Sequence, residues 1–306
     1  MWSLIKRGLF GKRLRVYGIN DANSFWREVF APLQGLFTPE EQERLRQATV
    51  AIPGLGGVGG THLVCLARSG VGRFKLAEFD TFEPRNISRQ YGARVDTLGR
   101  PKGEVMLEEV FKINPFVEIE FYKEGITPEN ARAFLAEADV VVDGIEFFAL
   151  KARKLLYDTA KEMNIPVITA GPLAFSAVLL VFDPQKSPSF SEYFDIKDDM
   201  SLTEQAIRFA LGLAPKPIFL KYLDLKSIDL KKGQGPASVI TCYLCSALAS
   251  MEAVRLILKR PGLKPVPHYF LFDLYLREIR EGFLKKGNRH PLQRLKIFYL
   301  KKKLGL

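Results

Sequence analysis

A glycine-rich segment, Gly54-Leu55-Gly56-Gly57-Val58-Gly59, constrains the fold of this chain more than any other feature. It directly follows the apolar run 49–53 and precedes a helix-forming segment that contains His62. Glycine accepts positive φ and places no Cβ between backbone N–H groups and an anion, and a helix N-terminus attracts negative charge. The order of strand, glycine turn and helix predicts a phosphate-binding turn, whose ligand could be NAD, FAD, S-adenosylmethionine or ATP.

Strand and helix patterns alternate after this turn. We expect strands near 49–53, 73–79, 117–122, 138–142 and 166–170, and helices near 58–70, 100–112, 128–137 and 149–162. This alternation predicts an α/β fold, with a Rossmann-like, doubly wound, mainly parallel sheet and helices on both faces. Further elements are expected as strands near 176–182 and 268–274 and helices near 201–212 and 237–260.

Three regions are expected along the chain. Residues 1–47 form a basic segment and an N-terminal helical arm, in which Thr38 is a suitable cap and Pro39 a suitable first helical residue. Residues 48–284 form the main domain, with an exposed polar loop at about 183–199. Residues 285–306 form a basic C-terminal tail.

The net charge of +11 is concentrated at the two ends. Residues 1–16 contain 5 Lys and Arg, residues 285–306 contain 8, and neither segment has an acidic residue, so residues 17–284 are close to neutral. Each end also contains apolar residues. The ends are therefore interpreted either as docked segments with a solvated basic face or as binding sites for RNA, an acidic protein or a membrane surface.

Composition favours a globular chain in a reducing compartment. With 306 residues and 47% hydrophobic content, the chain can bury a large core. We expect no transmembrane segment, because no apolar run is as long as a bilayer span, and the first residues lack a secretory signal. The 3 cysteines cannot form a disulfide framework, which also favours a cytoplasmic location.

Residues after the second strand narrow the choice of nucleotide. Glu78 ends that strand about 20 residues after the glycine turn, where an acid binds ribose hydroxyls and NAD is still permitted. Asn86, Arg89 and Lys102 would then bring one amide and two cations to the phosphate end of the pocket. Phosphoryl chemistry needs such cations, because negative charge develops on the leaving pyrophosphate.

In this context the chain resembles the ubiquitin-activating-enzyme-like superfamily, which includes the ThiF, MoeB and HesA adenylyltransferases. The resemblance runs from about Thr38 to Glu281. Its motifs are GLGGVG at 54–59, GVG at 70–72, EFD at 78–80, NISRQ at 86–90, GRPK at 99–102, NP at 114–115, VVDG at 141–144 and MEA at 251–253.

The resemblance implies a role for each matching residue. Gly54, Gly56, Gly57 and Gly59 would hold the ATP phosphates, Glu78 the ribose, and Asp80 and Gln90 would complete the nucleotide site. Catalytic roles would fall to Asn86, Arg89 and Lys102 at the triphosphate and to Asp143 as the Mg²⁺ ligand. The main domain would be an ATP-binding adenylation domain with its substrate loop at about 183–199.

The family's reaction and assembly are implied in the same way. A carboxylate would attack the α-phosphate of ATP, giving an acyl-adenylate and pyrophosphate. The carboxylate would belong to the C-terminus of a ubiquitin-like protein, a sulfur-carrier protein or a peptide. A homodimer is expected, in which Arg27 of the arm could reach the partner subunit's site.

The chain departs from the family pattern in several places. Glu78 replaces the usual Asp, and Glu146-Phe147 replaces the frequent Asp-Asn pair. Only one Cys-x-x-Cys pair occurs, Cys242 and Cys245, so we expect no structural zinc. These cysteines are interpreted as buried helix residues or as a thiolate near a helix start.

The step after adenylation is left open, because residues 171–241 contain no cysteine. Either the reaction ends at the adenylate, or Cys242, Cys245 or a partner protein supplies sulfur chemistry. His62 could face phosphate, although a packing or helix-surface role is the simpler interpretation.

Alternative functions also remain open. The carboxylate could belong to a modified tRNA, a small molecule or a peptide in antibiotic biosynthesis, and the basic ends keep nucleic acid as a partner. An NAD- or FAD-dependent oxidoreductase would leave Arg89 and Lys102 without a role. A non-catalytic nucleotide-binding protein would have no need of Arg89, Lys102 and Asp143 together.

Overall fold

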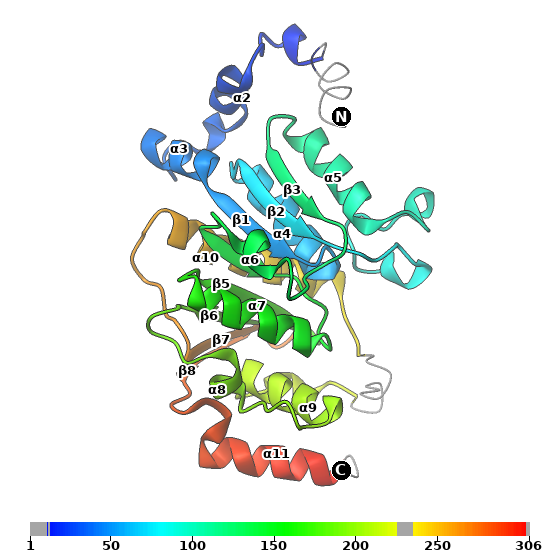
Figure 1. Cartoon of the computed structure of the whole chain (residues 1–306), viewed down its shortest axis with the longest axis vertical. Coiled ribbons are helices and arrows are strands. Elements are labelled where there is room, and N and C mark those ends of the chain that lie inside the picture. Colours follow the sequence, from blue (N-terminus) through cyan, green and yellow to red (C-terminus); the bar gives the residue numbers. More distant parts are fainter. Residues whose placement is uncertain (1–10, 12, 225–234, 304–306) are drawn as a thin grey trace.

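The computed structural model describes residues 11, 13–224 and 235–303, which contain one sheet of eight strands (Figure 1). The strands are β1 (Thr49–Pro53), β2 (Arg73–Ala77), β3 (Glu118–Tyr122), β4 (Val140–Asp143), β5 (Val167–Leu173), β6 (Ser176–Phe182), β7 (His268–Asp273) and β8 (Glu278–Phe283). Their order is β3-β2-β1-β4-β5-β6-β7-β8, with β1 to β5 parallel and β6 to β8 antiparallel. The predicted mainly parallel Rossmann-like sheet is confirmed.

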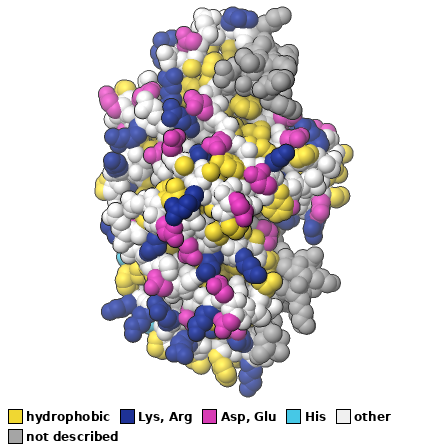
Figure 2. Space-filling view, in the orientation of Figure 1, with side chains coloured by type: hydrophobic (Ala, Val, Ile, Leu, Met, Phe, Trp, Pro, Cys, Tyr) yellow, Lys and Arg dark blue, Asp and Glu magenta, His cyan; other side chains and the backbone are white. Residues whose placement is uncertain are grey.

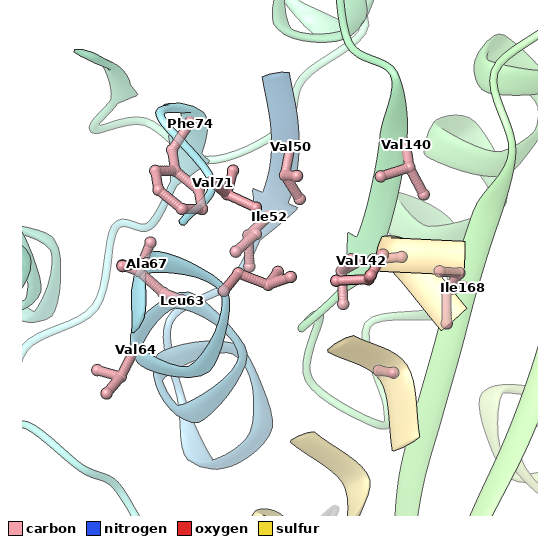
Figure 3. Packing of buried hydrophobic residues seen from close by; sticks show 14 of the residues in the cluster. Val50, Ile52, Leu63, Val64, Ala67, Val71, Phe74, Val140, Val142 and Ile168 are labelled. Atoms are coloured by element: carbon pink, nitrogen blue, oxygen red, sulfur yellow. The ribbon is translucent and has the colours of Figure 1, made fainter. Parts of the chain in front are cut away.

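Helices cover both faces of the sheet. On one face lie α4 (Gly57–Arg68), α5 (Lys102–Ile113) and α10 (Val239–Ile257). On the other lie α6 (Ala131–Leu135), α7 (Leu150–Glu162), α8 (Phe190–Phe194) and α9 (Leu202–Leu213). In Figure 3, strand residues such as Val50 and Ile52 face Leu63 of α4. The intervening Ala51 packs on the opposite face, as period-2 alternation requires.

An N-terminal helical arm lies at one end of the molecule (Figure 1). It contains α2 (Ala22–Val29), the short turn η1 (Ala31–Leu33) and α3 (Pro39–Gln47). The predicted cap of α3 is present, because Thr38 Oγ1 accepts a hydrogen bond from Glu41 N at 3.2 Å. Phe25, Trp26 and Phe30 form a small buried cluster that fixes α2 to the domain. Residues 1–10 and 12 lie outside the described residues.

The prediction of an exposed loop over 183–199 was wrong for residues 190–194, whereas the residues on either side form turns and irregular segments. Residues 190–194 form α8, whose N-terminus is capped by Ser189. Phe190, Tyr193 and Phe194 are almost completely buried in the core against α7 and α9. In the sequence, these aromatic residues lie among polar ones. They are three and four positions apart, a spacing that places them on one helix face.

The segment predicted as a basic tail, 285–306, contains a docked helix, α11 (Pro291–Lys303). Ile297 is buried against Ile207 and Leu211 of α9. Gln293 Nε2 donates to Leu211 O at 2.8 Å, and Lys301 pairs with Glu204 at 2.7 Å. The interpretation as a docked segment is therefore confirmed for the described part of this end.

Helix α10 bears on the expectation of no transmembrane segment. Helix α10 has 19 residues and a mean hydropathy of 1.4 in its most apolar window, so by length and composition it could span a membrane. Half of that window is buried in the protein, and Cys245, Ala249 and Ala253 of α10 pack in the core on β4–β6 and α4. Helix α10 is thus a core helix of this domain.

Candidate active site

The glycine turn lies between β1 and α4, where β1 meets β4 and the order of strands along the sheet reverses. Gly54 has a φ of +84°, and a Cβ added there would lie 2.3 Å from Gly144 O. A Cβ added at Gly59 would lie 1.8 Å from Gly54 O. Gly54, Gly59 and Gly144 therefore let the β1–α4 and β4–α7 connections touch, at the crevice where doubly wound sheets bind ligands.

The N-terminus of α4 has no side-chain cap in the part of the chain that the structure describes. Its cap residue is Gly56, and no side chain of the described residues makes a capping hydrogen bond there. The first N–H groups of a helix lack intrahelical partners, and the helix dipole favours an anion beside them. The turn thus has the backbone donors that a phosphate group needs.

Arg89 and Gln90 lie beside this turn, and their predicted contacts with a nucleotide stay predictions. Both follow the single turn η2 (Pro84–Asn86), and their backbone N–H groups donate to Asn86 O at 3.0 and 2.8 Å. A Cβ added at Gly56 would lie 3.7 Å from Gln90 Nε2, and one at Gly57 would lie 3.8 Å from Arg89 Cγ. Gln90 Oε1 is buried and has no hydrogen-bond partner among the residues that the structure describes.

Asn86 is buried and shapes the segment that carries Arg89. Its Oδ1 accepts a hydrogen bond from Glu83 N at 2.9 Å, which closes the η2 turn. The contacts of Asn86 are thus within its own turn, and the predicted contact with the triphosphate stays a prediction.

Glu78 holds the glycine turn to the end of β2. Its Oε2 accepts from Leu55 N at 2.8 Å, and its Oε1 accepts from Phe79 N and Asp80 N at 2.9 Å each. The carboxylate is buried, and these backbone donors compensate its desolvation. The structure therefore gives Glu78 a positioning role, and its contact with a ribose stays a prediction.

Lys102 and Asp80 form an ion pair at the same edge of the sheet. Lys102 Nζ lies 3.0 Å from Asp80 Oδ2, and Lys102 N donates to Asp80 O at 2.8 Å. The lysine side chain is 8% exposed, whereas that of Asp80 is 54% exposed. A cation at the start of α5 is thus held in place by an acid that keeps much of its contact with solvent.

Asp143, at the carboxyl end of β4, is fully enclosed by partners. Its Oδ2 accepts from Arg153 Nε and from Tyr157 Oη, both at 2.8 Å, and its Oδ1 accepts from Ile145 N at 2.9 Å. Asp143, Arg153 and Tyr157 are all buried. Burial, and then the Asp143 charge, raise the pKa of Tyr157 well above its ordinary value, so its hydroxyl stays a donor.

Arg153 is anchored on several sides. Its guanidinium also donates to the carbonyl oxygens of Ile145, Glu146 and Phe147 and lies 4.6 Å from the centre of the Phe209 ring. It therefore fixes the loop that follows β4. The sequence did not single out Arg153 and Tyr157. Both lie on the core-facing side of the predicted helix 149–162, where a charged side chain such as Arg153 needs a partner.

The predicted role of Asp143 as a Mg²⁺ ligand stays a prediction. Both carboxylate oxygens already accept hydrogen bonds, and a cation in their place would face the Arg153 guanidinium. Within 11, 13–224 and 235–303, no group of three or more His, Cys, Asp or Glu is placed to hold a metal. In this structure Asp143 binds Arg153, and no step of the reaction is assigned to a metal at this carboxylate.

His62 of α4 lies beneath the turn and packs in the core. It is completely buried, and neither ring nitrogen has a partner among the described residues. Burial lowers the pKa of His62 to about 4, and the Asp143 carboxylate opposes that shift. The packing interpretation of His62 is confirmed.

Cys242 and Cys245 are buried residues of α10. A Cβ added at Gly57 would lie 3.1 Å from Cys242 Sγ, so this thiol packs behind the glycine turn. Burial raises the pKa of Cys242 to about 11, although Arg89 lowers it, and burial also raises the pKa of Cys245. The interpretation as buried helix cysteines is confirmed, and a thiolate near the helix start does not fit this environment.

Arg27 lies on the surface of α2 and is 72% exposed. Its Nε contacts the neighbouring Glu28 at 3.2 Å. The side chain is therefore not buried in its own subunit.

Comparison with known proteins gives these residues a context. The model of the ThiF family matches residues 31–294. The tRNA threonylcarbamoyladenosine dehydratase of Haemophilus influenzae is 38% identical over 147 residues, which are 48% of this chain and 56% of that protein. The sulfur carrier protein adenylyltransferase of Thermus thermophilus is 33% identical over 162 residues, which are 53% of this chain and 58% of that protein.

The chain spans a little over half the length of these relatives, 56% and 58%. Among solved structures, Escherichia coli MccB with ATP gives a TM-score of 0.60 at 22% identity, covering 81% of this chain and 65% of MccB. PaaA gives a TM-score of 0.60 at 20% identity, covering 89% of this chain and 74% of PaaA. These two structures support the fold described above.

Proposed function

The chain belongs to the ThiF family, and we propose that it is an ATP-dependent adenylyltransferase that activates a carboxylate as an acyl-adenylate. The observation that carries the proposal is the placement of Arg89 and Gln90 beside the Gly56–Gly57 turn. These side chains lie beside the N-terminus of α4, which has no side-chain cap among the described residues, and the Arg89 guanidinium donates to Arg85 O at 3.0 Å. Lys102 supplies a second cation at the start of the next helix on the same face of the sheet.

The proposed reaction follows from this charge arrangement. The backbone donors of the α4 N-terminus hold the triphosphate, while Arg89 and Lys102 neutralise the charge that develops on the β- and γ-phosphates. A carboxylate oxygen attacks the α-phosphorus, the bond between that phosphorus and the bridging oxygen to the β-phosphate breaks, and pyrophosphate leaves. Glu78, through Leu55 N, keeps the turn in position during this exchange.

The site contains one group of residues suited to bind the nucleotide and another group that supports a loop. Arg89, Gln90 and Lys102 lie on segments that follow β2, whereas Asp143 and Arg153 hold the loop after β4. A nucleotide can therefore contact the first group without breaking the second. Asn86 and Asp80 belong to the proposed site through the residues that they position, Arg89 and Lys102.

For the substrate, we propose the C-terminal carboxylate of a ubiquitin-like or sulfur-carrier protein, or of a peptide. The Thermus thermophilus relative supports this choice by its name, sulfur carrier protein adenylyltransferase. Because Cys242 and Cys245 are buried and their pKa values are raised, the reaction of this chain ends at the adenylate unless the partner provides a thiol.

A carboxylate on a modified tRNA is the second candidate. The observation that favours it is the 38% identity to a tRNA threonylcarbamoyladenosine dehydratase. ATP consumption that depends on tRNA, and is not stimulated by any protein or peptide carboxylate, would select this substrate.

The proposal includes a homodimer in the cytoplasm, with Arg27 acting on the partner subunit's site. The exposure of Arg27 supports this arrangement, because the side chain is free to cross an interface. Analytical ultracentrifugation tests the dimer. Mixing an Arg27→Ala chain with an Arg89→Ala chain tests the action across subunits, since mixed dimers would regain one intact site.

Pyrophosphate–ATP exchange, measured across candidate carboxylate partners, tests the activity. We expect exchange in the unchanged protein and a loss of about 100-fold in Arg89→Ala, the size expected when one donor to a developing charge is removed. Arg85→Ala is the matched control, since Arg85 lies on the same turn, is exposed and pairs with Glu83. Tight NADH binding without ATP binding would instead support the oxidoreductase alternative and contradict the proposal.

A further inference from the structure

Helix α11 presents an apolar stripe to solvent. Leu292, Leu295, Phe298 and Tyr299 are between 62% and 66% exposed, although each is a large apolar or aromatic side chain. Their spacing of three and four residues places them along one side of the helix. The opposite side carries Gln293, Ile297 and Leu300 and packs on α9.

The docked side of α11 is already satisfied. Ile297 fills the contact with α9, Gln293 caps a backbone carbonyl of that helix, and Lys296 Nζ donates to Pro215 O at 2.7 Å. The outward stripe is therefore not needed to hold α11 in place. Exposed apolar patches of this kind mark interaction surfaces.

Basic side chains line one side of the stripe. A groove of about 840 Å³ runs between α11 and the α8–α9 segment and contains Lys197, Arg208, Arg289, Arg294, Lys301 and Lys302. Arg208 and Lys301 are held by Asp195 and Glu204. Lys197, Arg289, Arg294 and Lys302 make no ion pair with any residue that the structure describes, so their charge is available to a partner.

The position of α11 limits what can cover it. The helix forms the outermost edge of one end of the molecule, away from α4 and the glycine turn (Figure 1). At this end, Lys and Arg side chains lie interspersed with exposed hydrophobic side chains (Figure 2). The outward surface of α11 thus combines an apolar stripe with neighbouring cations.

We propose that α11 docks the protein on an anionic membrane surface, with its outward stripe inserted among the lipid headgroups and acyl chains. An exposed stripe of Leu, Phe and Tyr with Lys and Arg nearby can contact lipid headgroups and acyl chains while the other side of α11 stays packed on α9. Lipid phosphates match the unpaired cations, and each basic residue near an anionic leaflet adds to the attraction.

Other partners fit these residues less well. A second copy of α11 would bring two cationic borders together, and like charges at close range repel. RNA would use the cations and stack bases on Phe298 and Tyr299, but it offers nothing to Leu292 and Leu295, which are equally exposed. An anionic lipid surface accepts the aliphatic side chains and the cations together.

Co-sedimentation with vesicles tests the proposal on the full chain. We expect binding to phosphatidylcholine vesicles that contain phosphatidylglycerol to exceed binding to pure phosphatidylcholine vesicles by about tenfold. The double variant Leu295→Glu/Phe298→Glu is expected to lose about tenfold in binding to the anionic vesicles, because it places charge in the inserted stripe. Arg294→Glu/Lys302→Glu should lose a similar factor and its salt dependence.

Ile279→Glu/Phe283→Glu on β8 is the matched control, since these side chains are 52% and 56% exposed but lie outside α11. It should bind vesicles like the unchanged protein. All variants should keep the thermal unfolding midpoint and pyrophosphate–ATP exchange, which separates this proposal from the proposed activity. Equal binding to both vesicle types, unchanged binding of Leu295→Glu/Phe298→Glu, or binding to tRNA that only the Arg294 and Lys302 variant loses would each overturn it.

Discussion

Two ion pairs at the carboxyl edge of the sheet have similar geometry and different surroundings. Lys102 and Asp80 lie 3.0 Å apart, and Arg153 and Asp143 lie 2.8 Å apart. Both cations are buried, but the Asp80 side chain is 54% exposed, whereas that of Asp143 is 0% exposed. Solvent can therefore stabilise Asp80 when its partner moves to a ligand, and it cannot do so for Asp143.

The difference assigns separate roles to two acids that look alike in sequence. Lys102 can turn from Asp80 to a phosphate without leaving a bare buried charge. Arg153 cannot leave Asp143, because an uncompensated buried carboxylate is costly. The first pair is thus suited to binding and catalysis, and the second to holding the loop after β4.

The largest expected effect comes from breaking the buried pair. Arg153→Ala should lower the free energy of unfolding by about 3–5 kcal/mol, because the buried Asp143 carboxylate would lose its main partner. Urea denaturation followed by circular dichroism measures this loss.

Arg132→Ala is the matched control for that prediction. Arg132 pairs with Glu162 on the surface, where both side chains are more than 60% exposed. Its loss should cost at most about 1 kcal/mol. Equal effects of the two substitutions would remove the distinction between the buried and the exposed pair.

A smaller effect should appear in the pH dependence of stability, through His62. Its pKa is lowered from 6.5 to about 4, so in acid the unfolded chain takes up a proton before the folded chain does. The free energy of unfolding contributed by neutral His62 is therefore complete above pH 6.5 and is lost as the pH falls from there to about 4. The total loss is about 3 kcal/mol.

Denaturation curves of the unchanged protein and of His62→Gln, recorded across that pH range, isolate this contribution. The difference in unfolding free energy between the two proteins should shrink as the pH falls. A constant difference would show that His62 titrates alike in the folded and unfolded chains.

The Lys102–Asp80 pair should affect activity rather than stability. Lys102→Ala should reduce pyrophosphate–ATP exchange about 100-fold, equivalent to about 2.7 kcal/mol. Its unfolding free energy should change by about 1 kcal/mol or less, because Asp80 remains hydrated. A variant that unfolds as readily as Arg153→Ala would place Lys102 among the supporting residues.

The smallest effect is expected from Tyr157→Phe. It removes one buried hydrogen bond to Asp143 but leaves the Arg153 pair intact, so the expected loss of stability is about 1.5 kcal/mol. The comparison is Phe190→Tyr, at another buried ring in contact with Tyr157. It adds a buried hydroxyl instead of removing one. A loss for Tyr157→Phe as large as that of Arg153→Ala would contradict the ranking.

The parallel part of the fold was predictable from the sequence, and the later part was only partly so. Around Gly54, local periodicity and glycine chemistry predict strand, turn and helix correctly. At Phe190 and Tyr193, the surrounding polar residues hide a short helix whose burial depends on α7 and α9, which are distant in sequence. Strand β8 escaped prediction because it is half-exposed and carries charges between Ile279 and Phe283.

For the candidate site, the sequence predicted residues but not their partners. Arg89 and Gln90 lie beside the glycine turn, because a short motif fixes the loop that carries them. The role of Asp143 could not be inferred locally, since its partner Arg153 lies on the following helix. Only the packing of α7 on the sheet brings these charges together.

The most direct test of the account is a crystal structure of the chain with a non-hydrolysable ATP analogue. The account predicts the triphosphate at the N-terminus of α4, with Arg89 and Lys102 within hydrogen-bonding distance of its oxygens and Lys102 released from Asp80. Asp143 should still be bonded to Arg153. A triphosphate bound away from Arg89 and Lys102, or one that displaces Arg153 from Asp143, would contradict the separation of the binding pair from the supporting pair.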